Sequence, residues 1–94
     1  MFRITGGKGF HITFKNGYTL STQFGPGNYC DNYDMVIGKE DIEAGKRGSC
    51  EVEVAIISPS GKLIDLPDER GTVDGYIDSE KWYTYLQMAK NMDN

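Results

Sequence analysis

The chain has 94 residues, which is the length of one domain, since domains most often contain about 100–150 residues. Its 14 acidic and 10 basic residues give a net charge of −4 without a basic stripe, so we expect no nucleic-acid partner. No apolar run approaches the roughly 18 residues of a membrane span, and no basic segment precedes an apolar stretch. We therefore expect neither a membrane contact nor a secretory leader.

The first strong pattern is a β-hairpin over residues 10–24. Apolar and polar residues alternate on both sides of Asn16 and Gly17, a pair typical of hairpin turns. The apolar residues are all even-numbered: Phe10, Ile12, Phe14, Tyr18, Leu20 and Phe24. Only a three-residue loop ending at Gly17 keeps them on one face. We therefore predict Phe14 opposite Tyr18, with Gly17 in the left-handed conformation.

A second hairpin is predicted over residues 51–66 by the same reasoning. A three-residue loop ending at Gly61 places the apolar residues of its two strands on one face, namely Val52, Val54 and Ile56 opposite Ile64 and Leu66. Shorter strands are predicted at residues 1–5 and 71–77. The segment between the hairpins, residues 25–49, is long, polar and rich in glycine, which predicts a functional or mobile loop.

The C-terminal residues 78–92 predict a helix. Asp78 suits the N-cap position, and apolar residues follow at helical spacing: Trp82, Tyr85, Leu86, Ala89 and Met92. We interpret this stripe as core. The predicted fold class is α+β, with residues 1–94 forming a single domain in which a small antiparallel sheet of two β-hairpins carries the C-terminal α-helix on one face.

The register of the first hairpin brings two glycine-rich segments together at its open end. Glycines let backbone N–H groups approach an anion closely, and Lys8 adds an ammonium group. The order of a Walker P-loop is absent. The predicted phosphate contacts are Gly7, Lys8, Gly9, Gly25, Gly27 and Asn28. The alternative is that these glycines only shape bulges and turns.

Aromatic and Asx residues follow directly in the sequence. We predict that Tyr29 and Tyr33 stack on a base and that Asp31 and Asn32 contact a base edge or ribose. The alternative is that the Asx residues only form turns with their own backbone. The polar face of the first hairpin adds His11 and Gln23 as a ligand floor. The alternatives for that face are a solvated surface and a dimer contact.

Catalytic and metal-binding patterns are weak. Cys30 and His11 could form a nucleophile and base, but no local feature lowers the pKa of the thiol. The two cysteines, Cys30 and Cys50, lack metal-ligand spacing, and His11 is the only histidine. We therefore predict no enzyme activity, no metal and no cofactor. Two unpaired cysteines are typical of reduced thiols in the cytoplasm.

Several motifs resemble a known group of proteins. They are GKGFHITF at 7–14, NG at 16–17 and QFGPGNYCDN at 23–32, with EVAI at 53–56 and GYI at 75–77. The chain resembles a widespread family of small uncharacterised bacteriophage and prophage proteins. The resemblance implies a phage origin and action inside the host cell. By analogy with small accessory phage proteins, it also implies an anti-defence role such as sequestering a nucleotide immune signal.

The predicted function is therefore non-catalytic binding of a small phosphate-bearing ligand, a host nucleotide signal, by a homo-oligomer. The alternative is a protein-binding inhibitor of a host defence enzyme. That inhibitor would use the acidic face of the chain and the loop at 25–49.

Overall fold

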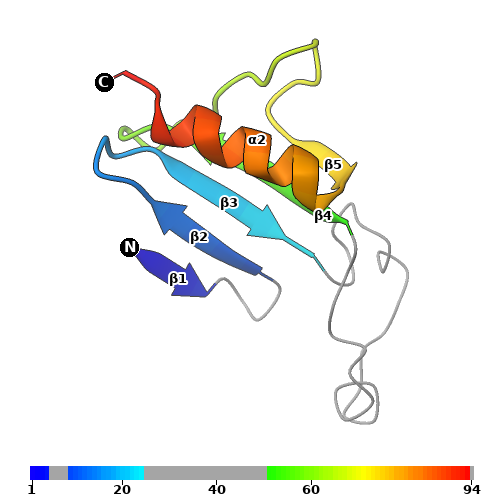
Figure 1. The fold of residues 1–94 in the computed structure, drawn as a ribbon. Helices are drawn as coiled ribbons and strands as arrows, with labels where there is room; N and C mark the ends of the chain where they lie inside the picture. Colours follow the sequence, from blue (N-terminus) through cyan, green and yellow to red (C-terminus); the bar gives the residue numbers. More distant parts are fainter. Residues whose placement is uncertain (5–8, 25–50, 94) are drawn as a thin grey trace, which may run out of the picture.

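The computed structural model describes residues 1–4, 9–24 and 51–93. These form a five-stranded antiparallel sheet and one C-terminal helix, so the predicted α+β class is confirmed (Figure 1). The strands lie in the order β1-β2-β3-β4-β5. The elements are β1 (Phe2–Ile4), β2 (Gly9–Thr13), β3 (Thr19–Gln23), β4 (Val52–Ile57), β5 (Asp74–Ile77) and α2 (Ser79–Lys90). The predicted loop at 25–49 lies outside the described residues.

The first hairpin has the predicted register. Ile12 pairs with Leu20, and the Phe14 N–H donates to the Tyr18 carbonyl at 2.9 Å. The loop between them has three residues, and Gly17 has a φ of +87°. These observations confirm the prediction. The physical reason is that only this register keeps the even-numbered residues on the helix side of the sheet.

The second hairpin has the predicted loop but not the predicted second strand. Ser58 N–H donates to the Lys62 carbonyl at 2.8 Å, and Gly61 has a φ of +86°. Beyond it, a single bridge pairs Leu63 with Ile57. The prediction of a strand reaching Leu66 is therefore wrong.

The predicted second strand ends early because of what occupies the edge of β4 that faces away from β3. β5 takes the start of this edge, where Val52 pairs with Ile77. Pro67 cannot donate to a ladder, and Asp68 and Glu69 turn the chain with φ values of 63° and 57°. Leu66 is still buried, so its apolar character places it in the core without placing it in a strand.

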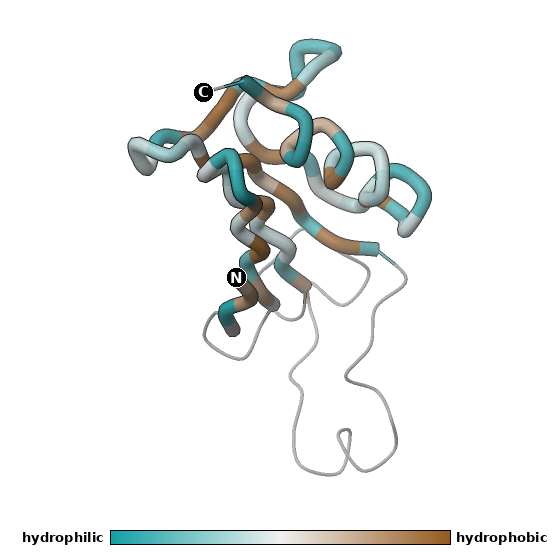
Figure 2. The backbone as a smooth tube through the Cα atoms, turned by 60° about the vertical axis from the view of Figure 1, so that its left-hand side comes forward, coloured by the Kyte–Doolittle hydropathy of each residue, from teal (hydrophilic) through white to brown (hydrophobic). Residues whose placement is uncertain are grey.

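The helix begins at its predicted cap, where Asp78 Oδ1 accepts the Lys81 N–H at 2.9 Å. Tyr85 and Ala89 are buried against the central strands, in the cluster Leu20, Val54, Ile56, Leu66, Ile77, Tyr85 and Ala89. Figure 1 shows α2 over β3, β4 and β5, with β1 and β2 beyond it, and Figure 2 shows α2 as a second layer on one side of the sheet. In the described ranges no helix has the length and apolar character needed to cross a membrane.

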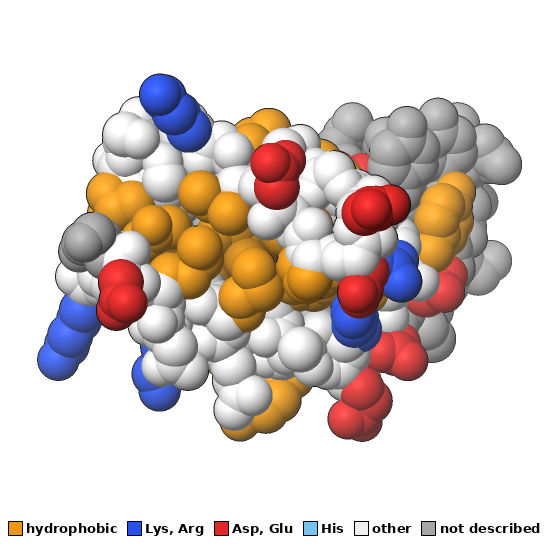
Figure 3. Space-filling view, turned by 90° about the horizontal axis from the view of Figure 1, so that it is seen from above, with side chains coloured by type: hydrophobic (Ala, Val, Ile, Leu, Met, Phe, Trp, Pro, Cys, Tyr) orange, Lys and Arg blue, Asp and Glu red, His pale blue; other side chains and the backbone are white. Residues whose placement is uncertain are grey.

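The core is not completely covered. Partly buried hydrophobic residues pack around it: Phe14, Tyr18, Val52, Ile64, Trp82, Leu86, Met88 and Met92. Figure 3 shows hydrophobic side chains reaching the surface as a band flanked by charged groups. Part of the hydrophobic surface around the core is thus exposed on this side of the molecule.

Candidate functional site

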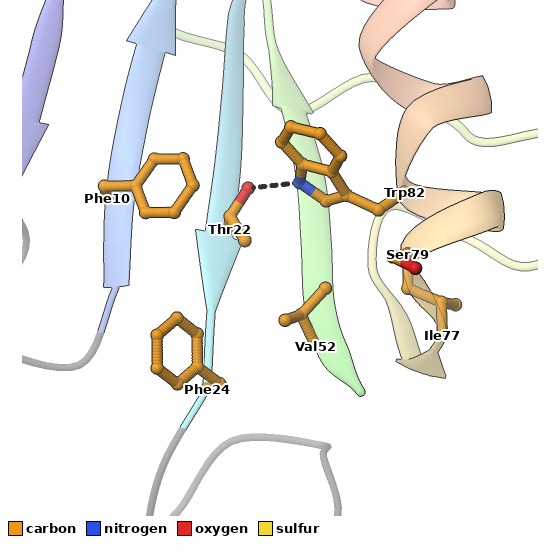
Figure 4. A pocket seen from close by; sticks show the side chains of 7 residues that line it. All are labelled: Phe10, Thr22, Phe24, Val52, Ile77, Ser79 and Trp82. Carbon is orange, nitrogen blue, oxygen red and sulfur yellow. Dashed lines mark hydrogen bonds between the residues drawn. The ribbon is translucent and has the colours of Figure 1, made fainter. Parts of the chain in front are cut away.

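A pocket of about 180 Å³ lies where the open end of the first hairpin meets the start of α2 (Figure 4). Its lining combines aromatic and aliphatic side chains with two hydroxyl groups. The described residues that line it are Phe10, Thr22, Phe24, Val52, Ile77, Ser79 and Trp82. They come from four neighbouring strands or their ends and from the first turns of the helix, so the pocket depends on the correct register of these four strands.

Side-chain parity explains why the strand residues meet there. Phe10 pairs with Thr22 across β2 and β3, and Phe24 is two residues beyond Thr22 and therefore on the same side. On the other side of the pocket, the backbone N–H of Trp82 donates to the backbone carbonyl of Asp78 at 2.9 Å. The capped first turn of α2 thus brings the indole over the sheet.

One hydrogen bond fixes the indole. Trp82 Nε1–H donates to Thr22 Oγ1 at 2.8 Å, and Thr22 is only 2% exposed. An indole N–H that is partly withdrawn from water needs such an acceptor. Figure 4 shows the rings of Phe10 and Phe24 on one side of the pocket and the indole on the other.

Gly9, a predicted phosphate contact, has a structural role beside the pocket. It pairs with Gln23, and a Cβ at this position would overlap the backbone oxygen of Thr22. β2 and β3 therefore approach each other too closely for any other residue. This close approach sets the position of Phe10, the next residue.

His11 and Gln23 lie on the opposite face of the sheet, because they are odd-numbered residues. Gln23 Nε2–H donates to Ser21 Oγ at 3.5 Å, and Arg3 Nη2 lies 3.3 Å from His11 Nδ1. Burial, and secondly the Arg3 guanidinium, lower the pKa of His11 below its ordinary value. The structure therefore does not bring these two predicted ligand contacts together with the pocket.

The face of the sheet opposite the helix carries the polar, odd-numbered residues of the first hairpin, yet some of its side chains are nearly buried. Ser21 and its cross-strand partner Ala55 are both 9% exposed. Thr13 and Thr19 contact each other through their hydroxyl groups at 2.8 Å. The side chains on this face thus engage one another in hydrogen-bonded pairs.

The remaining predicted site residues lie outside the described part of the chain, and their roles stay predictions. They include the alternative nucleophile Cys30. The predicted ligand contacts among them are Gly7, Lys8, Gly25, Gly27, Asn28, Tyr29, Asp31, Asn32 and Tyr33.

A second polar cluster joins β5 to the helix, with Tyr85 and Asp74 buried and the Arg70 side chain 46% exposed. Tyr85 Oη–H donates to Asp74 Oδ2 at 2.7 Å, and Arg70 Nη1–H donates to Asp74 Oδ1 at 3.1 Å. Burial, and then the hydrogen bond to Asp74, raise the pKa of Tyr85 to about 12. Both carboxylate oxygens have a partner, so the cluster serves to anchor β5 to α2. Within residues 1–4, 9–24 and 51–93, no group of side chains is suited to hold a metal ion.

The pocket itself is the feature that sequence patterns miss. Trp82 belongs to the apolar stripe of the helix and is interpreted from sequence as core, although it also forms a pocket wall. The even-numbered position of Thr22, a hydroxyl residue on an apolar face, is the one signal that could have identified the site. Comparisons of the chain with models of protein families, with curated protein sequences and with solved structures found no match.

Proposed function

We propose that this protein is a non-catalytic binder of a small phosphate-bearing ligand of the nucleotide class. The observation that supports the proposal is the aromatic pocket at the open end of the first hairpin. Phe24 lines this pocket, and the chain continues from Phe24 directly into Gly25. Lys8 directly precedes Gly9, so the predicted phosphate contacts adjoin the pocket in sequence.

The chemistry of the lining favours binding over catalysis. The described lining residues offer aromatic and aliphatic side chains and the hydroxyls of Thr22 and Ser79. His11, the residue best suited to act as a general base, lies on the other face of the sheet. A binding protein needs affinity without turnover, and an apolar pocket with few polar groups supplies it.

The biological setting follows from the resemblance to small phage proteins. We place the protein in the cytoplasm of the host cell, where it sequesters a nucleotide immune signal. The exposed hydrophobic band supports a homo-oligomer, because exposed hydrophobic surface is commonly buried by association (Figure 3). Sedimentation of the purified protein tests this part: a monomer at all concentrations contradicts it.

A thermal-shift panel tests the binding proposal. Nucleoside monophosphates and cyclic nucleotides are the probes, and at least one is expected to raise the melting temperature. Lys8→Ala removes one charge-assisted contact and should weaken binding about tenfold to a hundredfold. Lys62→Ala is the matched control, because Lys62 is exposed directly after the loop of the second hairpin.

The thermal-shift panel also tests the alternative function, a protein-binding inhibitor of a host defence enzyme. If no phosphate-bearing probe shifts the melting temperature and the protein instead binds a host defence enzyme, the proposal is wrong. Exposed acidic residues around the turn at 67–71 would be the contacts to test in that case, namely Asp65, Asp68 and Glu69.

A further inference from the structure

We infer that the pocket takes a neutral heteroaromatic ring, a nucleobase, and that the charged groups of the same ligand stay outside it. The ring would lie against the side chains of Phe10 and Phe24 and face the indole of Trp82. The inference rests on the proposed function for the identity of the whole ligand. It goes further in stating which part of the ligand enters the pocket and what recognises that part.

The size of the pocket favours a ring. An apolar cavity of about 150 Å³ in a protein admits benzene, whereas pockets for whole drug-sized ligands measure about 300–1,000 Å³. At about 180 Å³, this pocket has room for one aromatic ring system. The ribose and phosphate of a nucleotide must then lie beyond its mouth.

The aromatic lining favours a flat occupant. Three of the seven described lining residues are aromatic: Phe10, Phe24 and Trp82. Every nucleobase has a π-face that can stack on such side chains. The indole is held in place by its bond to Thr22, so the pocket wall is ordered before the ring enters.

The polar groups of the lining favour a neutral ring with hydrogen-bonding edges. The indole N–H takes one lone pair of Thr22 Oγ1, which leaves the hydroxyl proton of Thr22 as a donor. Ser79 is exposed at the start of α2 and offers both a donor and an acceptor. None of the described lining residues carries a charge, so a carboxylate or phosphate inside the pocket would lose its hydration without compensation.

Trp82 is the single tryptophan of the chain, so its fluorescence reports directly on the pocket. The protein is titrated with adenosine, adenosine 5′-monophosphate, ribose 5-phosphate and choline, with excitation of the indole alone. Adenosine and its monophosphate are expected to quench the emission in a saturable way. Ribose 5-phosphate and choline are expected to leave it unchanged.

Paired variants locate the effect. Phe10→Leu and Phe24→Leu keep an apolar side chain but remove a stacking surface, and each should weaken adenosine binding at least fivefold. Phe2→Leu is the matched control. Phe2 pairs with Ile12 on the same face of the sheet, but it is 79% exposed and does not line the pocket. Its variant should bind adenosine like the parent.

The outcomes separate this inference from the proposed function. If phosphate-bearing probes raise the melting temperature but no base quenches Trp82, the ring inference is wrong and the proposed function stands. If adenosine quenches Trp82 and a phosphate group adds no affinity, the ring inference stands and the proposed phosphate contacts are wrong. Quenching by choline alone would indicate a cation bound by aromatic faces and would overturn the inference.

Discussion

Thr22 Oγ1 accepts the indole N–H of Trp82 at 2.8 Å across 60 residues of sequence. The bond joins the first turns of α2 to β3 and closes one side of the pocket (Figure 4). Both groups would otherwise be partly or fully buried without a partner. This one contact therefore serves the stability of the fold and the shape of the candidate site together.

Replacing Thr22 tests that double role. Thr22→Val keeps the shape but removes the acceptor, and the unpaired indole N–H should lower the free energy of unfolding by about 1–3 kcal/mol. Thr22→Ser keeps the hydroxyl and should lose less. Urea unfolding followed by Trp82 fluorescence measures both variants. A valine variant as stable as the parent would show that the hydrogen bond contributes nothing.

The two loop glycines give a matched pair of variants. Gly17 and Gly61 have nearly the same φ, +87° and +86°, so replacement by Ala should cost each about 1–2 kcal/mol in backbone strain. A Cβ at Gly17 would also lie 3.0 Å from Pro59 Cγ, whereas a Cβ at Gly61 would meet nothing within 4 Å. Gly17→Ala should therefore be the more destabilising change in urea unfolding. A larger loss for Gly61→Ala would contradict the packing of the two loops.

Asn16 connects the first loop to the end of the helix. Its Nδ2 lies 2.9 Å from the carbonyl oxygens of both Ala89 and Met92, at the C-terminal end of α2, where carbonyl groups lack the regular helical hydrogen bond. Asn16→Ala should lower the free energy of unfolding by about 1–2 kcal/mol. Lys15→Ala changes the exposed neighbouring residue and should have little effect. If the two variants unfold at the same urea concentration, this capping role is wrong.

The single histidine allows a direct test of the polar face. Because burial and Arg3 lower the pKa of His11, its ring should titrate below pH 6.5 in proton NMR. Arg3→Gln should raise the pKa only in part, since burial is the larger cause and remains. A titration midpoint at or above 6.5 would contradict the observed environment.

The lowered pKa of His11 also makes the stability of the fold depend on pH. The unfolded chain takes up the proton on His11 at a higher pH than the folded chain does. The contribution of His11 to stability is therefore complete above about pH 6.5 and is lost as the pH falls through the lower pKa of the folded state. His11→Gln should remove this part of the pH dependence in urea unfolding.

Local sequence patterns predict the elements whose determinants are close together in the chain. The parity of apolar residues sets the register around Gly17, and Asp78 followed by a helical stripe sets the start of α2. Contacts between residues that are far apart in the chain cannot be predicted in this way. The capping of Ala89 by Asn16 spans 73 residues, and no local pattern encodes it.

The candidate site was predictable only in part for the same physical reason. Alternation correctly placed Phe10 and Phe24 on one face, but their meeting with Trp82 depends on how α2 crosses the sheet. The sequence predicts His11 and Gln23 as a ligand floor on the polar face of the first hairpin, whereas the pocket lies on the apolar face. In a strand, neighbouring side chains point to opposite faces, and this separates both residues from the pocket.

The central claim is that the pocket beside Trp82 binds the base of a small phosphate-bearing ligand. The indole N–H of Trp82 gives one resonance in a proton–nitrogen correlation spectrum, since the chain has one tryptophan. The measurement is that spectrum during titration with ribonucleoside 5′-monophosphates and their cyclic forms. The account predicts a saturable shift of the indole resonance with at least one of them, and a weaker response in Phe24→Leu. An indole resonance that stays unchanged through the entire panel would contradict the account.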